Sequence, residues 1–385
     1  MSARRYEVCV SGAGAVAMSL SLALSAQGWR VAWARPEAAA TMPRHDVRTY
    51  ALNARAIQLL ERLRVWPELQ AHATPVWDMV IRGDDGGQLA FSAWQQQVRE
   101  LTWIVDASAL ERLLAQALRY APGVEAVPPV VGLDDCPAAL LAVCEGKHSG
   151  TREALGVRFD RQDYGHMGVA ARLKASVPHH GVARQWFRSP DVLALLPFHD
   201  PVPGASYGLV WSVPTERAQA LMAMAPDEFE RELQSAVVLS DPQAPALVGE
   251  VSLASERAAW PLALAQAERW CGPGWVLLGD AAHQVHPLAG QGLNLGLADV
   301  DALVEALGEA RQQTPWRSPG DERTLQRFVR RRLWPTRAMS GLTDGLLHLF
   351  ADPRSPVRDL RNTGMRLVQQ AGPLKRWLVG QALDA

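Results

Sequence analysis

The sequence predicts an α/β fold, in which a Rossmann-like domain is interrupted by an inserted, mainly antiparallel β-sheet domain and followed by a helical C-terminal tail. Three observations predict it. A strand, a glycine-rich turn and a helix open the chain. A buried strand and a second glycine-rich stretch return near residue 275, and strand-like pieces cut by frequent prolines lie between.

The strand-rich middle would make the Rossmann-like domain discontinuous. We expect that domain in residues 1–75, 100–160 and 265–325, the inserted domain in residues 76–99 and 161–264, and the helical C-terminal region in residues 326–385.

The opening pattern is typical of a βαβ unit. Residues 6–11 are an apolar run suited to a buried strand, the Ala/Leu-rich residues 18–27 suit a helix, and residues 30–34 suit the next strand. Further along we expect helices over residues 54–63, 110–118 and 293–307 and from residue 324 onward, strands over 140–144 and 275–278, a hairpin over 76–91 turning at Asp84-Asp-Gly-Gly87, and a mostly antiparallel sheet over 164–260.

Composition excludes several classes of protein. The chain has 385 residues, 48% hydrophobic and 21% charged, which excludes low-complexity disorder. Its net charge of −1 gives no reason to expect a nucleic-acid partner. The four cysteines form no C-x-x-C pair, which argues against a disulfide framework or a structural zinc site and for a reducing compartment.

An uncharged N-terminal run over residues 8–29 makes an exported or membrane-anchored protein a rival interpretation. The strand-turn-helix interpretation is favoured because it explains Gly12 and Gly14, which an export signal does not require. The C-terminal region is basic: residues 330–377 hold ten Arg or Lys against three Asp, with apolar residues interleaved. That character suits an anionic membrane surface, although a solvated helical face is the commoner meaning.

Two motifs point to a nucleotide. Gly12-x-Gly14-x-x-Ala17 lies between a strand and a helix, where the glycines permit a tight turn and close approach of a pyrophosphate, and Ala17 is small enough for helix–strand packing. The stretch from Val276 to Asp299 places Gly279-Asp280 after a strand and Gly290-Gln291-Gly292 at a helix start. Asp280, His283 and His286 have no spacing that would make them converge, so we expect no metal site.

The second stretch closely resembles the GD motif of the ubiquinone-biosynthesis hydroxylase family, which belongs to the FAD-dependent group A aromatic monooxygenases. The resemblance runs almost end to end. It includes Asp46-Val-Arg48-Thr-Tyr-Ala-Leu52, Glu145-Gly146-Lys-His-Ser-Gly-Thr-Arg152, Trp260-Pro-Leu262, Leu342-Thr-Asp344-Gly345-Leu and Arg361-Asn362.

The resemblance implies an FAD-binding domain and assigns roles to residues. Gly12, Gly14 and Ala17 would hold the FAD pyrophosphate, and Arg35 would stand at the adenosine ribose. Gly279, Asp280 and Pro287 would form the GD loop, with Asp280 on the ribityl chain. Gly290, Gln291, Gly292, Leu293 and Asn294 would face the isoalloxazine. Gly146 and Arg152 would line the channel used by FAD and the reductant, and Arg48 would contact the flavin or its electron donor.

This chain departs from the family at Arg35, where members carry a Glu that accepts both ribose hydroxyls, and at Glu145, where they carry Asp. Arginine has no acceptor, so losing two such bonds would cost roughly 3 kcal/mol, about a hundredfold in affinity. Glu37 is an alternative acceptor, and an arginine beside a ribose could instead suit the 2′-phosphate of NADP.

By resemblance, the function is hydroxylation of the aromatic ring of a polyprenylated phenol by O2 in ubiquinone biosynthesis, through a flavin C4a-hydroperoxide. Electrons would come from NAD(P)H or a reduced electron-transfer protein. Candidate bases are His283, His286 and Tyr164. The candidate walls of an apolar tunnel are Trp186, Phe187, Trp211 and Trp260, although ordinary core packing is the commoner meaning of any one of them.

We expect a cytoplasmic protein, peripheral at the inner face of the membrane, with a ubiquinone-biosynthesis complex as a further partner. The rival function is a catalytically weakened scaffold or lipid-binding subunit of that complex, which FAD content would distinguish from the enzyme.

Overall fold

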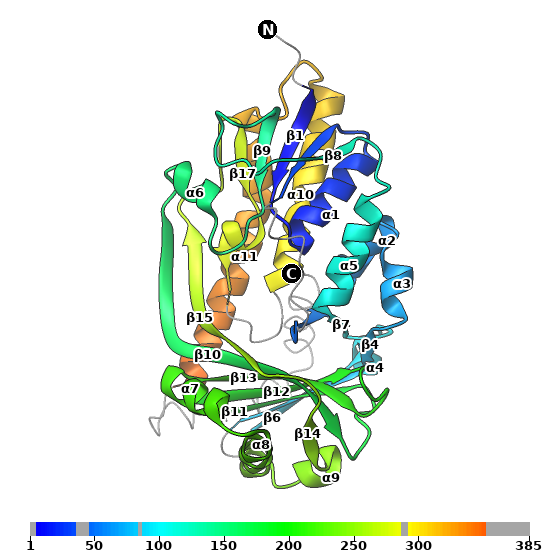
Figure 1. The fold of residues 1–385 in the computed structure, drawn as a ribbon, viewed down its shortest axis with the longest axis vertical. Helices are drawn as coiled ribbons and strands as arrows, with labels where there is room; N and C mark the ends of the chain where they lie inside the picture. The colour runs from blue at the N-terminus through cyan, green and yellow to red at the C-terminus, as the bar shows by residue number, and fades with distance from the viewer. Residues whose placement is uncertain (1–4, 36–45, 84–86, 286–291, 352–385) are drawn as a thin grey trace.

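A computed structural model describes residues 5–35, 46–83, 87–285 and 292–351 (Figure 1). They form an upper unit built on a mainly parallel sheet, a lower unit built on a mainly antiparallel sheet, and a long C-terminal helix. The α/β class and the inserted antiparallel sheet predicted from the sequence are confirmed.

The upper sheet runs in the order β16 (Cys271–Gly272), β17 (Trp275–Leu277), β9 (Ala138–Val143), β1 (Tyr6–Ser11), β2 (Val31–Ala34) and β8 (Val124–Val127). β1 is parallel to both its neighbours, with Val8 opposite Val31 and Leu140. Side chains on both faces of the central strands are buried, which explains their continuous apolar runs.

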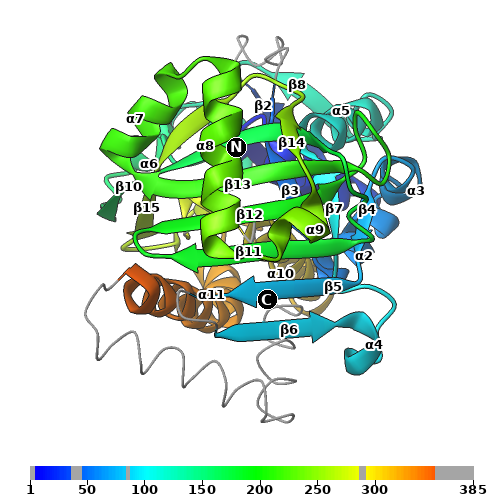
Figure 2. The ribbon, with the colours of Figure 1, turned by 90° about the horizontal axis from the view of Figure 1, so that it is seen from below.

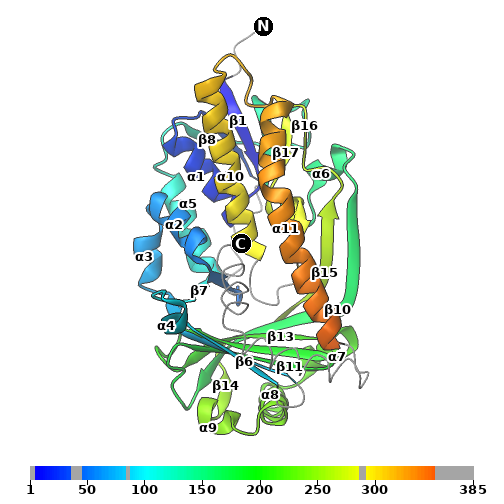
Figure 3. The same cartoon turned by 180° about the vertical axis from the view of Figure 1, so that it is seen from behind.

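The long helices α5 (Ala107–Leu118), α1 (Ala15–Ala26), α10 (Gly292–Gln313) and α11 (Glu322–Ala351) pack side by side in one layer against this sheet (Figures 1 and 3). The other helices of the upper unit are α2 (Ala54–Arg62), α3 (Trp66–Gln70) and α6 (Gly150–Ala154). The 3-10 turn η2 (Gly279–Ala281) follows β17. A small sheet of β3 (Thr49–Leu52), β7 (Thr102–Asp106) and β4 (Thr74–Val76) lies between the two units.

The lower sheet runs in the order β18 (His283–Gln284), β15 (Ala258–Ala267), β10 (Phe159–Ala175), β13 (Ser206–Pro214), β12 (Asp191–Phe198), β11 (Val182–Arg188), β5 (Asp78–Arg82) and β6 (Gln88–Ser92), with β14 (Val251–Leu253) beside β10. β5 and β6 form the predicted hairpin, whose tip at 84–86 lies outside the described residues. β10 and β15 reach from the upper unit into the lower sheet, and their register shifts between Asp163 and His166.

One face of the lower sheet is covered by α7 (Thr215–Ala223), α8 (Pro226–Ser240) and α9 (Ala244–Val248), as the view from below shows (Figure 2). The buried cluster there joins Trp211 and Leu193 to Phe229 and Leu233 of α8. Because successive strand residues alternate between faces, their neighbours point to the upper unit. α4 (Ala93–Gln96) follows β6 at the sheet edge.

The C-terminal helix α11 (Glu322–Ala351) packs beside α10 and continues through Pro335 (Figure 3). It confirms the helix predicted from residue 324, whereas the tail beyond residue 351 lies outside the described residues. α10 is longer than predicted and extends to Gln313. No helix in the described ranges has the length and apolarity needed to cross a membrane.

Candidate functional site

The turn between β1 and α1 leaves an open approach to the helix start. Gly12 has φ +138°, and a Cβ there would collide with the carbonyl of Cys144. Gly14 is the N-cap of α1, and a Cβ there would meet no atom of the described residues within 4 Å. Among the described residues no side chain caps this helix, and its first turn carries no acid, so its N–H groups are available to an anion.

Small residues bring the turn against the Gly279-Asp280 loop. A Cβ on Gly12 would lie 3.3 Å from the Cβ of Ala17, which is fully buried. A Cβ on Gly279 would lie 3.3 Å from Cγ2 of Val16, and one on Gly296 only 2.6 Å from the same methyl. The backbones of α1, the loop and α10 therefore meet closely, as a phosphate cradle requires.

A buried carboxylate fixes the loop. Asp299 of α10 has no exposed surface and accepts hydrogen bonds from the N–H of Gly279 at 2.9 Å and from Nε2 of His283 at 2.7 Å. Nε of Arg332, on α11, donates to its other oxygen at 2.7 Å. Burial alone would raise its pKa, but His283 and Arg332 hold the pKa of Asp299 below the ordinary value.

Asp280 itself takes no part in these hydrogen bonds and is exposed to solvent. Desolvation by the surrounding protein raises the pKa of Asp280, whereas the charges of His283, Lys147 and Arg48 act to lower it. Asp280, Lys147 and Arg48 thus lie near enough for their charges to interact, although they come from different segments.

Asn294 ties the start of α10 to the small sheet. Its amide donates to the carbonyl of Ala51 at 2.7 Å, and its Oδ1 accepts from the N–H of Asn53 at 3.2 Å. Gly292 begins α10 and Leu293 is half-buried against the upper core. His286, Pro287, Gly290 and Gln291, which the resemblance places at the flavin, lie outside the described residues.

Arg48 is held by carboxylates of two segments, Asp46 and Glu111. Its guanidinium makes a two-pronged hydrogen bond with Asp46 and lies 3.7 Å from Glu111. Hydrogen bonding to Asp46 raises the pKa of Arg48, and burial raises the pKa of Glu111 and of the neighbouring Tyr50. Arg48 is 44% exposed, so a ligand can still reach it.

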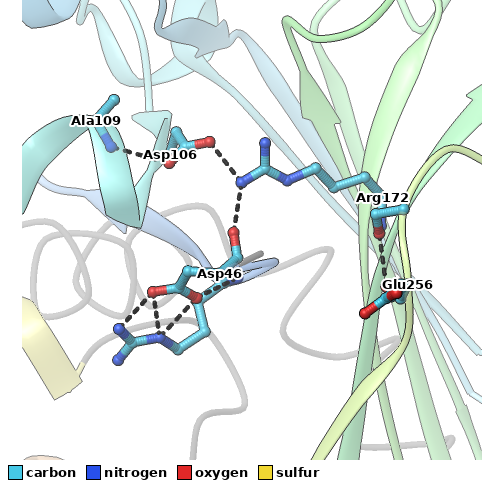
Figure 4. A network of polar contacts seen from close by, with 7 residues as sticks. Asp46, Asp106, Ala109, Arg172 and Glu256 are labelled. Atoms are coloured by element: carbon cyan, nitrogen blue, oxygen red, sulfur yellow. Dashed lines mark hydrogen bonds and ion pairs between the residues drawn. The ribbon is translucent and has the colours of Figure 1, made fainter. Parts of the chain in front are cut away.

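Arg172 joins the lower sheet to this cluster (Figure 4). Its guanidinium forms an ion pair with Asp106 at 2.5 Å and donates to the carbonyl of Asp46 at 2.8 Å. Asp106 also caps α5 by accepting from the N–H of Ala109 at 3.0 Å. One lower-sheet residue thus positions both the start of α5 and the segment that carries Arg48.

Glu145 and Arg152 brace the loops that follow β9. Glu145 accepts hydrogen bonds from Ser11, Ser149 and Thr151, and despite burial these hold its pKa below the ordinary value. Arg152 is 3% exposed and donates to the carbonyls of Ala281 and Lys147. Its role along a channel stays a prediction. Gly146, with φ +78°, makes the turn between the two.

A cavity of about 850 Å³ opens beside the glycine turn. Ala13 and Met18 line it from the turn and α1, Trp33 and Arg35 from β2, and Glu111 from α5. This volume lies in the range of cofactor sites. Arg35 thus lines a cavity of suitable size, and its place at an adenosine ribose stays a prediction.

The structure separates the three candidate bases. His283 is 3% exposed, packs against Trp270 at 4.8 Å and donates to Asp299, so it positions the loop and is not free to reach a substrate. Tyr164 lies in the bulge of β10, and its carbonyl bonds to His166. His286 is outside the described residues.

Two of the four aromatic residues considered as tunnel walls are core residues, which was the alternative left open for each of them. Trp186 and Trp211 belong to the cluster beneath the lower sheet and are at most 2% exposed. Phe187 and Trp260 lie on the opposite face of the lower sheet, which faces the upper unit, because successive side chains of a strand alternate between faces. On that face the ring of Trp260 lies over Gly168.

Sequence reasoning missed Asp299 as the acid that organises the loop, together with its partner Arg332. The signal was present: Asp299 is an acid within a run of apolar residues that α10 buries, where a carboxylate needs partners.

The open turn at α1 and the space beyond Gly14 fit a dinucleotide pyrophosphate, because any side chain there would fill the cradle. Fold and site together define an FAD-binding flavoprotein of the monooxygenase class. The chain belongs to the FAD-binding domain family, whose model matches residues 134–332.

Relatives of known name agree with this class. The chain is 28% identical to the ubiquinone hydroxylase UbiL of Rhodospirillum rubrum, over 98% of this chain and 89% of that protein. It is also 28% identical to the 3-demethoxyubiquinol 3-hydroxylase of Escherichia coli, over the whole of both chains. In structure it resembles PqsL of Pseudomonas aeruginosa, with a TM-score of 0.76 at 20% identity, covering 94% and 99% of the two chains. PnpA of Pseudomonas putida, a p-nitrophenol 4-monooxygenase, gives 0.75 at 17% identity, covering 97% and 96%.

Proposed function

We propose that this chain is an FAD-dependent monooxygenase that hydroxylates the aromatic ring of a polyprenylated phenol in ubiquinone biosynthesis. The main support is its similarity, over nearly its full length, to proteins named for ubiquinone hydroxylation. The open glycine cradle beside the Asp280 loop supports the cofactor half of the proposal.

Bound FAD supplies the redox chemistry and the activation of O2, which no side chain provides. The protein would do the rest. Gly12 and Gly14 let the pyrophosphate approach α1, while Asp299 holds the backbone of Gly279 and thereby sets the position of Asp280. Arg172 keeps the lower sheet docked to the segment of Arg48, which limits the entry of water between the two units.

The ring of the substrate would lie between the cofactor and the upper face of the lower sheet. Phe187, Val192 and Trp260 give this face its apolar character. Gly168 and Ala170 have little or no side chain, which leaves space above the sheet. The phenol proton would go to His286 or Tyr164, since His283 is committed to Asp299.

Product analysis tests the proposal. The purified holoenzyme is incubated with a reductant, O2 and a prenylated phenol, and the product is examined by mass spectrometry. We expect stoichiometric FAD and a product heavier by one oxygen atom, which carries label from ¹⁸O2. A protein that holds FAD, is reduced and yields no labelled product from any prenylated phenol contradicts the proposal.

We further propose NAD(P)H or a reduced electron-transfer protein as the electron donor. Anaerobic bleaching of the bound flavin distinguishes these donors, since only the true donor reduces it at a rate that supports turnover.

We also propose a cytoplasmic enzyme that binds peripherally to the inner face of the membrane through α11. Arg323, Arg330, Trp334 and Arg337 recur at helical spacing along this helix, and all four are exposed. Arg331 differs, because it pairs with Glu305 and Glu309. We expect sedimentation with anionic but not neutral vesicles, weakened at high salt and by Arg330→Glu/Arg337→Glu. A pathway complex would appear as co-purification of other ubiquinone-biosynthesis enzymes.

A further inference from the structure

Three arginine side chains line the cavity beside the glycine turn without a carboxylate partner. Arg35 follows β2, Arg112 lies on α5 and Arg119 follows it, and all three are exposed. Within the described ranges, none of the three forms an ion pair. Arg35 and Arg119 also line a second cavity of about 320 Å³ next to the first.

Trp33 determines where the charge of Arg35 lies. The indole Nε1 donates to the carbonyl of Gly12 at 2.8 Å, and the guanidinium of Arg35 lies over the indole, 5.1 Å from its centroid. The indole of Trp33 therefore holds Arg35 near the glycine turn and separates the two by the width of one ring. The phosphates of a dinucleotide approach the start of α1 at this turn.

The acids that line the same cavity are mostly engaged elsewhere. Asp106 is paired with Arg172, and Glu111 lies beside Arg48. Asp200, on the lower unit, is the remaining acid of the lining. The ribose end of the cavity consequently carries an excess of positive charge.

A guanidinium donates five hydrogen bonds and accepts none, so it cannot receive the hydroxyls of a ribose, but it matches a phosphate with two parallel bonds. We propose that Arg35, supported by Arg112 and Arg119, recognises a phosphate group of the bound dinucleotide at the ribose end of this cavity. Arg35 then contributes to cofactor affinity by donating hydrogen bonds to a phosphate, whereas a ribose-binding carboxylate accepts hydrogen bonds from hydroxyl groups. The inference rests on the proposed FAD function. The phosphate belongs either to the pyrophosphate of FAD or to the 2′-phosphate of an NADP-type reductant.

The change in FAD affinity when the charge at position 35 is reversed tests this inference. Flavin-free, full-length protein is titrated with FAD by fluorescence quenching at low and high salt. We expect Arg35→Gln to weaken binding about tenfold and to flatten its salt dependence, and Arg35→Glu to weaken it further. The exposed Arg231→Glu on α8 is the matched control and leaves FAD affinity unchanged. If Arg35→Glu binds both FAD and 2′,5′-ADP as tightly as the wild type or tighter, the ribose is held by an acceptor and the inference is wrong. Unchanged melting temperatures show that the variants are folded.

Competition with FAD distinguishes the two phosphates. If Arg35 binds the pyrophosphate, we expect ADP to displace FAD better than adenosine does. If Arg35 binds a 2′-phosphate of the ribose, we expect 2′,5′-ADP to displace FAD better than ADP does. In either case the advantage disappears in Arg35→Gln. Equal displacement by all three compounds overturns the inference. Failure of the proposed function looks different: FAD then binds with the expected dependence on Arg35, but no hydroxylated product forms.

Discussion

The Nε atom of Arg332 lies 2.7 Å from a carboxylate oxygen of Asp299, and both side chains are almost fully buried. Arg332 belongs to α11, whereas Asp299 belongs to α10 and holds Gly279 through its other oxygen. The C-terminal helix is thus connected to the loop of Asp280 through a single carboxylate.

Removing one charge of this pair should cost much more than removing both. We expect Asp299→Asn to lower the free energy of unfolding by about 3 kcal/mol, because it leaves the guanidinium of Arg332 buried without a counter-charge. Asp299→Asn/Arg332→Met should be less destabilised than the single variant. Urea unfolding monitored by tryptophan fluorescence measures both, and a double variant that is the least stable would contradict the explanation.

The same carboxyl group makes stability depend on pH. Its pKa in the folded protein is below the unfolded value, so its contribution is complete above about pH 4 and is lost as the pH falls through the folded pKa. We expect the wild type to lose more stability than Asp299→Asn between pH 5 and pH 3. Parallel pH profiles for the two proteins would show that other carboxyl groups dominate.

Alanine substitutions at the two glycines of the turn should have different effects, one on stability and the other on FAD affinity. Gly12→Ala should lower the melting temperature, because its Cβ would collide with the Cys144 carbonyl at a φ that side chains rarely adopt. Gly14→Ala should fold normally, because its Cβ meets no protein atom, yet FAD affinity should fall at least tenfold because that Cβ occupies the phosphate approach. Melting curves and FAD titrations of both variants separate the effects. Normal FAD affinity in a folded Gly14→Ala would place the pyrophosphate elsewhere.

Breaking the contact between the two units should loosen the site without unfolding either unit. Arg172→Gln removes the ion pair to Asp106 and the bond to the Asp46 carbonyl. We expect faster amide hydrogen exchange at residues 46–52 and faster release of FAD, with a loss in stability of about 1–3 kcal/mol. Arg217→Gln, which removes ion pairs within the lower unit only, is the control. Equal exchange at residues 46–52 in both variants would remove Arg172 from this role.

Local patterns were sufficient to predict the parts of the fold that local chemistry determines. The apolar run, the glycine turn and the helix over residues 6–27 are adjacent in sequence, so the β1–α1 unit could be placed directly. The Gly279-Asp280 loop was found in the same way, because strand, acid and glycines follow one another.

Contacts between distant segments could not be predicted. His283 was a candidate base because of its place in the loop, but its burial depends on Asp299 and Trp270, which only tertiary packing brings together. Trp186 and Phe187 are consecutive aromatic residues, and both faces of the lower sheet are largely apolar. Hydrophobic alternation, which normally identifies the buried face, therefore gave no means of deciding between them.

The continuous course of β10 and β15 has a consequence for protein engineering. Both strands run from the upper unit into the lower sheet, and they remain paired with each other for most of their length. A cut at either predicted domain border near residue 161 or 264 would fall within this ladder and leave unpaired backbone groups on both fragments. Chimaeras that exchange the substrate-facing sheet between relatives should therefore transfer β10 and β15 whole, with junctions in the loops that precede and follow them.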